Sequence, residues 1–134
     1  DGDCLREVPN IKMKGFLTGD ELTSLMANAK VMLLPSVWYE NCPLSILETH
    51  SYGVPVITMN SGGMAELVED GKTGALVNEP TPQAVAEAIR RCFEDEGYYK
   101  TLKENCETMR EKIIGVSEYC DIMIEKYNDL IKKR

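Results

Sequence analysis

The sequence is poor in the residues that bind metal ions, and it has fewer cationic than acidic residues. It contains one histidine, and none of its five cysteines stands in a C-x-x-C spacing, so no zinc site is expected. Separated cysteines of odd number are typical of reduced thiols in a cytosolic protein. Fifteen Lys and Arg against 22 Asp and Glu give a formal net charge of −7. That balance argues against nucleic-acid binding and against a polybasic membrane anchor.

Long hydrophobic runs, repeats and flexible linkers are also missing. No apolar stretch approaches the roughly 18 residues that a membrane span needs, and no signal-peptide pattern is present. A length of 134 residues suits one domain and not two ordinary ones. Because the opening residues 1–4 include no start methionine, we expect residues 1–134 to be a single partial domain.

Short apolar runs alternate with helical patterns along the chain. The predicted strands are 11–14, 31–34, 54–58 and 75–77, and the predicted helices are 18–29, 43–52, 64–69, 81–93, 98–112 and 116–132. Strand–helix–strand units joined by right-handed crossovers predict an α/β fold, a Rossmann-like, doubly wound parallel sheet with C-terminal helices. Four strands are few for such a sheet, so we expect it to be incomplete.

Two local patterns carry more specific expectations. Thr18 and Glu21 have the spacing of a capping box at the start of a helix. The run Val31–Leu34 is continuously apolar and is ended by Pro35, which is typical of a parallel strand buried on both faces.

The segment after the strand 31–34 is the most promising place for chemistry, because ligands of open α/β sheets bind beyond the carboxyl ends of the strands. There a loop carrying Glu40 leads into a helix that Pro43 can begin, and Glu48 lies about one and a half turns inside that helix. The amides of Leu44 and Ser45 would have no helical partner and would suit a phosphate. Carboxylates beside a phosphate suit hydroxyl groups instead, so the pattern favours a nucleotide sugar.

The spacing Glu40-x7-Glu48 resembles the E-x7-E signature of retaining glycosyltransferases of family 4, also called glycosyl transferases group 1. Four further segments resemble motifs of that family in the same order: Asn10–Phe16, Ala29–Ser36, Gly53–Ile57, and Gly62-Gly63 followed by Glu66, Gly71 and Gly74. One such motif occurs often by accident, whereas five in register do not.

The resemblance implies the C-terminal, donor-binding half of a GT-B enzyme, with a nucleotide-sugar-binding core over 10–95 and C-terminal helices over 96–134. It implies that Glu40 is catalytic and accepts hydrogen bonds from the transferred sugar, and that Glu48 binds the ribose. The residues between them would hold sugar hydroxyls and the diphosphate: Asn41, Cys42, Pro43, Leu44 and Ser45.

The same resemblance implies a metal-independent, retaining hexosyl transfer that uses no cofactor. The acceptor, a glycan or a lipid, would bind through an N-terminal domain, and the enzyme would act in the cytoplasm or at the inner face of a membrane. The family's strand, Gly-Arg turn and Lys that hold the diphosphate are not found before the matching motifs, so we expect this chain alone to be inactive. The alternatives are a nucleotide-sugar-binding module without catalysis and a degenerate GT-B interaction domain.

Several residues have two interpretations. Asn41 and Cys42 stand where many members have a glycine and an aromatic residue, which would reshape the sugar pocket. Trp38 and Tyr39 could line the cleft or fill the loop. His50 is expected to be a packing or surface residue rather than a base.

Two further features are also open. The pair Gly62-Gly63 could approach the donor or satisfy a turn. The apolar stripe of the last helix could be helix core or a face that meets another domain; it comprises Tyr119, Ile122, Met123, Tyr127, Leu130 and Ile131.

Overall fold

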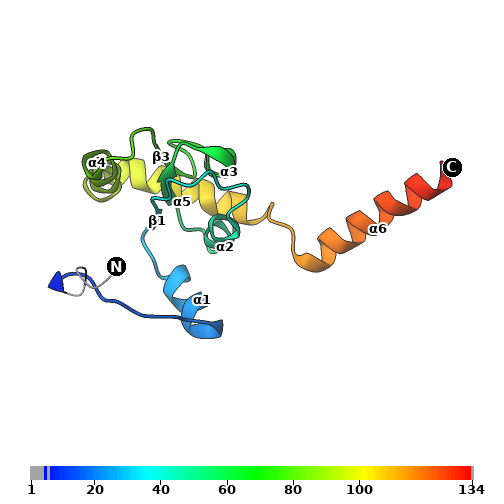
Figure 1. Cartoon of the computed structure of the whole chain (residues 1–134), viewed down its shortest axis with the longest axis horizontal. Coiled ribbons are helices and arrows are strands. Elements are labelled where there is room, and N and C mark those ends of the chain that lie inside the picture. The colour runs from blue at the N-terminus through cyan, green and yellow to red at the C-terminus, as the bar shows by residue number, and fades with distance from the viewer. Residues whose placement is uncertain (1–4, 6, 134) are drawn as a thin grey trace.

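The computed structural model describes Leu5 and residues 7–133, and it shows an α/β fold with a small parallel sheet (Figure 1). The opening residues 1–4 lie outside the described residues. Three strands form the sheet in the order β1-β2-β3: β1 Met32–Leu34, β2 Val56–Met59 and β3 Gly74–Val77. Both neighbouring pairs are parallel, with Leu33 opposite Ile57 and Ile57 opposite Ala75.

Six helices complete the described part of the chain. They are α1 Gly19–Ala27, α2 Leu44–Ser51, α3 Gly62–Leu67, α4 Pro82–Glu94, α5 Glu96–Arg110 and α6 Val116–Lys132. Helices α2 and α3 contact the central strand β2, α4 contacts β3, and α5 packs on α2 and α4. The expected α/β class with C-terminal helices is therefore confirmed.

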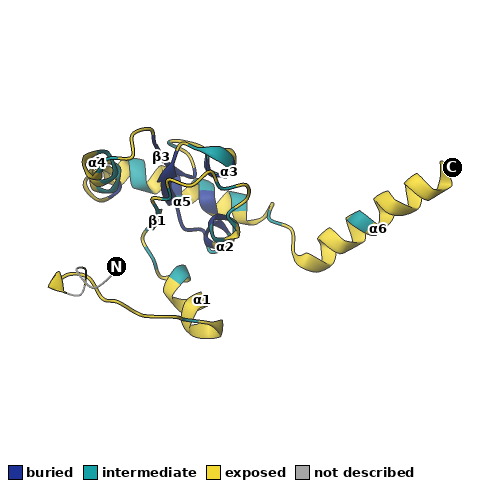
Figure 2. Ribbon diagram, in the orientation of Figure 1, coloured by how far each residue is buried: buried dark blue, intermediate teal, exposed yellow. Residues whose placement is uncertain are grey.

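The core surrounds β2, in which every residue is buried, and it includes Ile46 of α2, Met64 of α3 and Leu102 of α5. In Figure 2 the buried residues gather at the sheet and the helices around it, whereas α1 and α6 are almost entirely exposed. A central parallel strand has hydrogen-bonded neighbours on both sides and helices on its faces, which explains its continuous apolar sequence.

Helix starts in the second half of the chain follow their sequence signals. Thr81 caps α4 by accepting a hydrogen bond from the Ala84 amide (3.2 Å), and Pro82 occupies the first helical position. Asp95 caps α5 in the same way through the Tyr98 amide (2.8 Å). The ammonium of Lys30 lies 4.3 Å from the ring centroid of Phe93 on α4 and 4.6 Å from that of Tyr99 on α5. These cation–π contacts join the segment before β1 to both helices.

Three expectations for the first third of the chain are wrong. Residues 11–14 are exposed and form no strand, because no neighbouring strand pairs with them in the described chain. The run Val31–Leu34 is not buried on both faces: Leu33 is 40% exposed, since β1 lies at the edge of the sheet. Thr18 does precede α1 in extended conformation, but its side chain makes no capping hydrogen bond.

Other boundaries differ by a few residues. The short helix expected at 64–69 begins two residues earlier, at Gly62, and the strand expected at 54–58 is Val56–Met59. The helix expected at 98–112 begins at Glu96, because Asp95 supplies the cap. Within the described residues, no helix is both long and apolar enough to cross a membrane.

Candidate functional site

The candidate site lies where β1 ends at Leu34 and a loop leads to α2. The loop is held by short-range hydrogen bonds: the Trp38 amide donates to Ser36 Oγ (3.3 Å), and the Glu40 amide donates to the Trp38 carbonyl (3.0 Å). Pro43 is the N-cap of α2 and makes no side-chain capping bond. The first amides of α2, those of Leu44 and Ser45, therefore have no cap from the residue before the helix and remain available to an anionic ligand.

The predicted site residues all lie on this loop and the first turns of α2. Glu40 is half-buried and Glu48 is exposed in the second turn of the helix. Asn41 and Cys42 are exposed, Pro43 and Ser45 are half-buried, and Leu44 is 65% exposed. A ligand at this end of α2 would thus meet two backbone amides, with one carboxylate before them on the loop and another after them on the helix.

The structure shows which backbone the glycine pair Gly62-Gly63 contacts, whereas the sequence allowed either an approach to the donor or a turn. The Gly63 amide donates a 2.7 Å hydrogen bond to the Glu40 carbonyl. A Cβ at Gly63 would lie 1.6 Å from the Asn41 carbonyl oxygen, and one at Gly62, whose φ is +51°, would lie 2.5 Å from the Glu40 carbonyl oxygen. Only glycine therefore allows the start of α3 to approach the loop so closely. The pair supports the backbone that carries Glu40.

Two asparagines at the carboxyl ends of the strands were not predicted as site residues from the sequence. Asn60 follows β2 and Asn78 follows β3, and the Asn60 side-chain amide donates to the Asn78 side-chain oxygen (2.8 Å). Their only sequence signal is their position directly after two neighbouring parallel strands. Both are exposed, so this amide pair adds polar groups beside the loop end of the sheet.

His50 lies inside the fold, which agrees with a packing role. It is fully buried, and its Nε2 lies 3.2 Å from the Thr73 carbonyl oxygen. Burial lowers the pKa of His50, although the contact with Thr73 partly opposes that effect. The neutral ring donates from Nε2, and Nδ1 has no partner. Its burial keeps this imidazole away from an exposed ligand.

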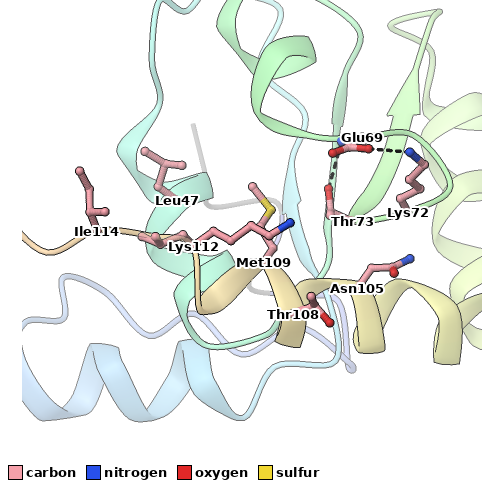
Figure 3. A pocket seen from close by; sticks show the side chains of 10 residues that line it. Leu47, Glu69, Lys72, Thr73, Asn105, Thr108, Met109, Lys112 and Ile114 are labelled. Atoms are coloured by element: carbon pink, nitrogen blue, oxygen red, sulfur yellow. Dashed lines mark hydrogen bonds and ion pairs between the residues drawn. The ribbon is translucent and has the colours of Figure 1, made fainter.

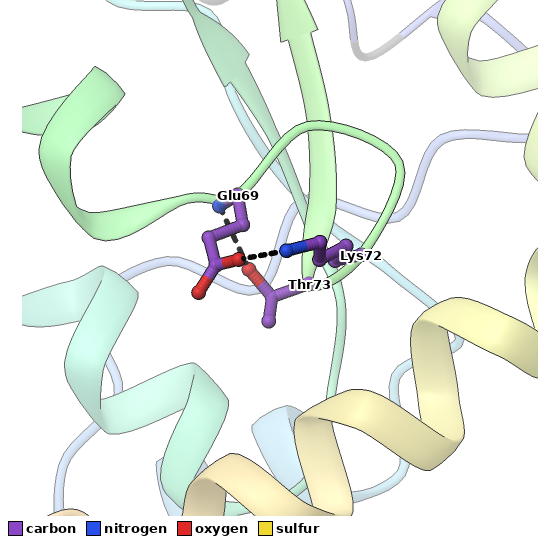
Figure 4. Close-up of polar contacts among 3 residues, drawn as sticks. All are labelled: Glu69, Lys72 and Thr73. Atoms are coloured by element: carbon purple, nitrogen blue, oxygen red, sulfur yellow. Dashed lines mark hydrogen bonds and ion pairs between the residues drawn. The ribbon is translucent and has the colours of Figure 1, made fainter.

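A cavity of about 490 Å³ lies elsewhere, at the amino end of β3, lined by α2, α5 and the turn before the strand (Figure 3). Figure 4 shows the turn: Lys72 Nζ lies 2.8 Å from Glu69 Oε2, and the Glu69 amide donates to Thr73 Oγ1 (3.0 Å). The hydrogen bond and charge of Lys72 lower the pKa of Glu69. The three strands are parallel, so the amino end of β3 and the carboxyl end of β1 lie at opposite ends of the strands. The cavity therefore does not belong to the candidate site.

Possible metal ligands do not gather in the described part of the chain: it contains no group of three or more His, Cys, Asp or Glu side chains arranged to hold an ion. The site therefore offers a ligand backbone amides, two carboxylates and exposed polar side chains. Amides at a helix start suit phosphate, and carboxylates suit hydroxyl groups.

The family model described as glycosyl transferases group 1 matches residues 6–109. The chain belongs to the glycosyl transferases group 1 family. It is 33% identical over 108 residues to a putative colanic acid biosynthesis glycosyltransferase, WcaL, of Salmonella typhimurium, covering 77% of this chain and 26% of that protein. It is also 33% identical over 110 residues to glycogen synthase of Pseudomonas syringae pv. tomato, covering 81% of this chain and 22% of the synthase. The chain thus spans about a quarter of the length of these curated relatives.

Solved structures give the same result. The crystal structure of Anabaena Alr3699/HepE in complex with UDP-glucose superimposes with a TM-score of 0.82 and 26% identity, covering 96% of this chain and 35% of that one. Sucrose-phosphate synthase from Thermosynechococcus elongatus matches with a TM-score of 0.74 and 28% identity over 85% of this chain and 28% of the synthase. The resemblance to family 4 glycosyltransferases and the expected α/β fold are therefore confirmed.

Proposed function

We propose that the chain binds a nucleotide-diphosphate sugar at the start of α2 and forms the donor-binding part of a retaining glycosyltransferase. The observation that carries the proposal is the pair of available amides, Leu44 and Ser45, between the carboxylates Glu40 and Glu48. The similar HepE structure was solved with UDP-glucose, which supports this class of ligand. The amides would bind the diphosphate, Glu48 the ribose hydroxyls and Glu40 the sugar hydroxyls.

The proposed chemistry follows from where charge develops. When the bond between the sugar and the diphosphate breaks, negative charge grows on the leaving group, and the amides and dipole at the start of α2 stabilise it without a metal ion. Positive charge grows on the sugar ring, and the half-buried carboxylate of Glu40 would stabilise it while positioning the hydroxyl groups. Asn41, Cys42 and Pro43 would complete the wall of the sugar pocket.

The remaining parts of the proposal concern the whole enzyme. The acceptor, a polysaccharide, a lipid or another molecule, would bind through a further domain, and transfer would take place in the cytoplasm or at the inner face of a membrane. We expect the 134-residue chain alone to bind donor without transferring the sugar. Acceptor-dependent transfer by this chain at the rate of a full-length relative would contradict that expectation.

Amide NMR spectra of the ¹⁵N-labelled chain, titrated separately with UDP-glucose, GDP-mannose and ADP-glucose, test the proposal. We expect one donor to shift the Leu44 and Ser45 amides in a saturable way. Glu48→Gln should weaken that binding roughly tenfold, because a charge-assisted hydrogen bond to the ribose is lost. Glu87→Gln, which changes an exposed carboxylate on α4, is the matched control and should leave the affinity unchanged.

The alternatives give different results. Saturable donor binding without any sugar transfer by the full-length protein would favour a binding module without catalysis. Full transfer activity of Glu40→Gln in the full-length protein would show that Glu40 is not catalytic. No shift of the Leu44 and Ser45 amides with any of the three donors, measured also in an intact C-terminal domain, would favour an interaction domain and would contradict the proposal.

A further inference from the structure

The cavity between α2, α5 and the turn before β3 takes no part in the proposed donor site, and its size suits a small ligand (Figure 3). Its volume of about 490 Å³ falls within the range of small-molecule sites, roughly 300–1,000 Å³. Three segments that are distant along the chain supply its walls: Leu47 belongs to α2, Thr73 to the turn and Met109 to α5. Ligand sites commonly form in such concave places between packed elements.

One side of the cavity is apolar. Leu47 and Met109 lie on the two helices, and Ile113 and Ile114 lie on the segment between α5 and α6. Three of these side chains are half-buried and Ile114 is 43% exposed, so all four still present apolar surface to water. A ligand that covers this surface gains from the hydrophobic effect. The cavity therefore favours a ligand with an apolar body.

The other side of the cavity carries more positive than negative charge. Lys72 and Lys112 line it together with one carboxylate, that of Glu69. Lys72 Nζ lies 2.8 Å from Glu69 Oε2, whereas Lys112 pairs with no carboxylate among the described residues. Lys72 lowers the pKa of Glu69, and the charge of Lys112 lowers it further, so Lys112 lies near the ion pair. One ammonium group is therefore left to attract an anion.

The cavity beside β3 and α4 has a similar size and the opposite charge. Its volume is about 460 Å³, and Asp70, Glu79 and Glu87 line it against one cation, Arg91. The whole chain likewise has a net charge of −7. Since charges act over about 8 Å at physiological salt, an anion is repelled at the cavity beside α4 and attracted at the one that Lys112 lines.

We propose that the cavity between α2 and α5 binds a small amphipathic anion, a molecule with an apolar body and one carboxylate or phosphate group. The apolar body would lie against Leu47, Met109 and Ile113, and the anionic group would meet the ammonium of Lys112. The side-chain amide of Asn105, which also lines the cavity, can donate a hydrogen bond to the same group. The inference is independent of the proposed donor site, which lies at the other end of the strands.

Amide NMR spectra of the ¹⁵N-labelled 134-residue chain test the inference, with octanoate and octyl phosphate as separate probes below their micelle concentrations. We expect at least one of them to shift the backbone amides of Thr73, Asn105 and Lys112 in a saturable way, and the comparison shows which anionic group is preferred. Hexanoate should bind roughly tenfold more weakly than octanoate, because two fewer methylene groups are buried. Acetate, which has no apolar body, and octyltrimethylammonium, which has the opposite charge, should cause no saturable shift.

Variants locate the anionic group. Lys112→Gln should weaken binding of the anionic probe about two- to fivefold, the usual contribution of an exposed ion pair. Lys100→Gln is the matched control, because Lys100 is an exposed lysine of α5 that pairs with Glu104 (3.7 Å) and does not line the cavity. It should leave the affinity unchanged.

Three outcomes would overturn the inference. The first is the absence of a saturable shift at Thr73, Asn105 and Lys112 with both anions. The second is equally tight binding of octyltrimethylammonium, which would mean that the cavity does not select negative charge. The third is a set of shifts confined to α6, whose exposed apolar surface is another place for an alkyl chain. Because donor binding is read from the Leu44 and Ser45 amides, each outcome can occur while the proposed donor site stands.

Discussion

The carbonyl oxygen of Thr73 accepts hydrogen bonds from three donors that belong to three parts of the fold. The Val56 amide of β2 lies at 3.3 Å, His50 Nε2 of α2 at 3.2 Å and Cys106 Sγ of α5 at 3.2 Å. Burial raises the pKa of Cys106 to about 12, so the thiol stays protonated and keeps donating. This one oxygen therefore fastens the helix that carries Glu48 to the sheet and to α5.

The His50 contact predicts a pH dependence of folding. Burial lowers the pKa of His50 below its unfolded value of about 6.5. Between those two pKa values the unfolded chain binds a proton that the folded chain does not, so the free energy of unfolding falls as pH drops below about 6.5. Urea denaturation should show this decrease below pH 6.5, with a slope of at most about 1.4 kcal/mol per pH unit, the limit for the uptake of one proton.

His50→Leu is the matched variant for that measurement, because His50 is the only histidine of the chain. The variant should be less stable at pH 7.5, where the hydrogen bond to Thr73 is lost, and its stability should change little between pH 6.5 and 5. Equal slopes for both proteins over this range would show that His50 is not the titrating group.

At the scale of elements, the contact between the start of α3 and the site loop decides the geometry of the site. The loop follows β1 and α3 follows β2, so two neighbouring strands bring these segments together at one edge of the sheet. The hydrogen bond from the Gly63 amide to the Glu40 carbonyl connects α3 to the loop.

Gly63→Ala should therefore disturb the site more than the rest of the fold. Its Cβ would lie 1.6 Å from the Asn41 carbonyl oxygen, so the loop or α3 must shift, at about 1–3 kcal/mol of stability. We expect the donor-induced NMR shifts of the Leu44 and Ser45 amides to need at least tenfold more ligand.

Two other glycines are controls for this prediction. Gly115→Ala should be neutral, because nothing lies within 4 Å of its Cβ position. Gly74→Ala places a Cβ 1.9 Å from the Val56 carbonyl oxygen inside the sheet, so it should destabilise the whole domain. Normal donor affinity of Gly63→Ala would show that the close approach is not needed for the site.

Prediction from the sequence succeeded where a local pattern decides the structure. The loop after β1, the helix that begins one residue after Pro43 and the cap at Thr81 depend on residues that are close along the chain. It failed for 11–14 and for the burial of Val31–Leu34, since strand formation and edge position depend on which distant segments pair. Gly63 packs on Asn41, which is distant along the chain. The glycine pair therefore indicated a tight turn or a close approach, but the sequence could not show that Asn41 is the residue approached.

At the scale of the molecule, α6 stands away from the core and buries none of its residues (Figure 1). It nevertheless exposes a large apolar surface along its length, formed by Val116, Tyr119, Ile122, Ile124, Tyr127, Leu130 and Ile131. An exposed apolar surface of this kind favours association between molecules in water. The apolar stripe of the last helix is therefore not part of the core, and no other element of the described chain packs on it.

Removal of α6 tests whether the core is independent of it. A chain ending at Gly115 should keep its melting temperature within about 2 °C, because α6 buries none of its residues. A loss of 1 kcal/mol would lower that temperature by roughly 2–8 °C, depending on the size of the domain. The truncated chain should also sediment as a monomer at concentrations where the full chain associates.

A second variant separates the apolar face from the length of the chain. Ile122→Lys combined with Leu130→Lys keeps α6 and interrupts its exposed apolar surface, so it should reduce association without changing the melting temperature. A fall in melting temperature of more than about 5 °C on truncation would mean that α6 packs on the core in solution. Equal association of the full chain and the double variant would mean that another surface, with the exposed Trp38 and Tyr39 as the next candidates, brings the molecules together.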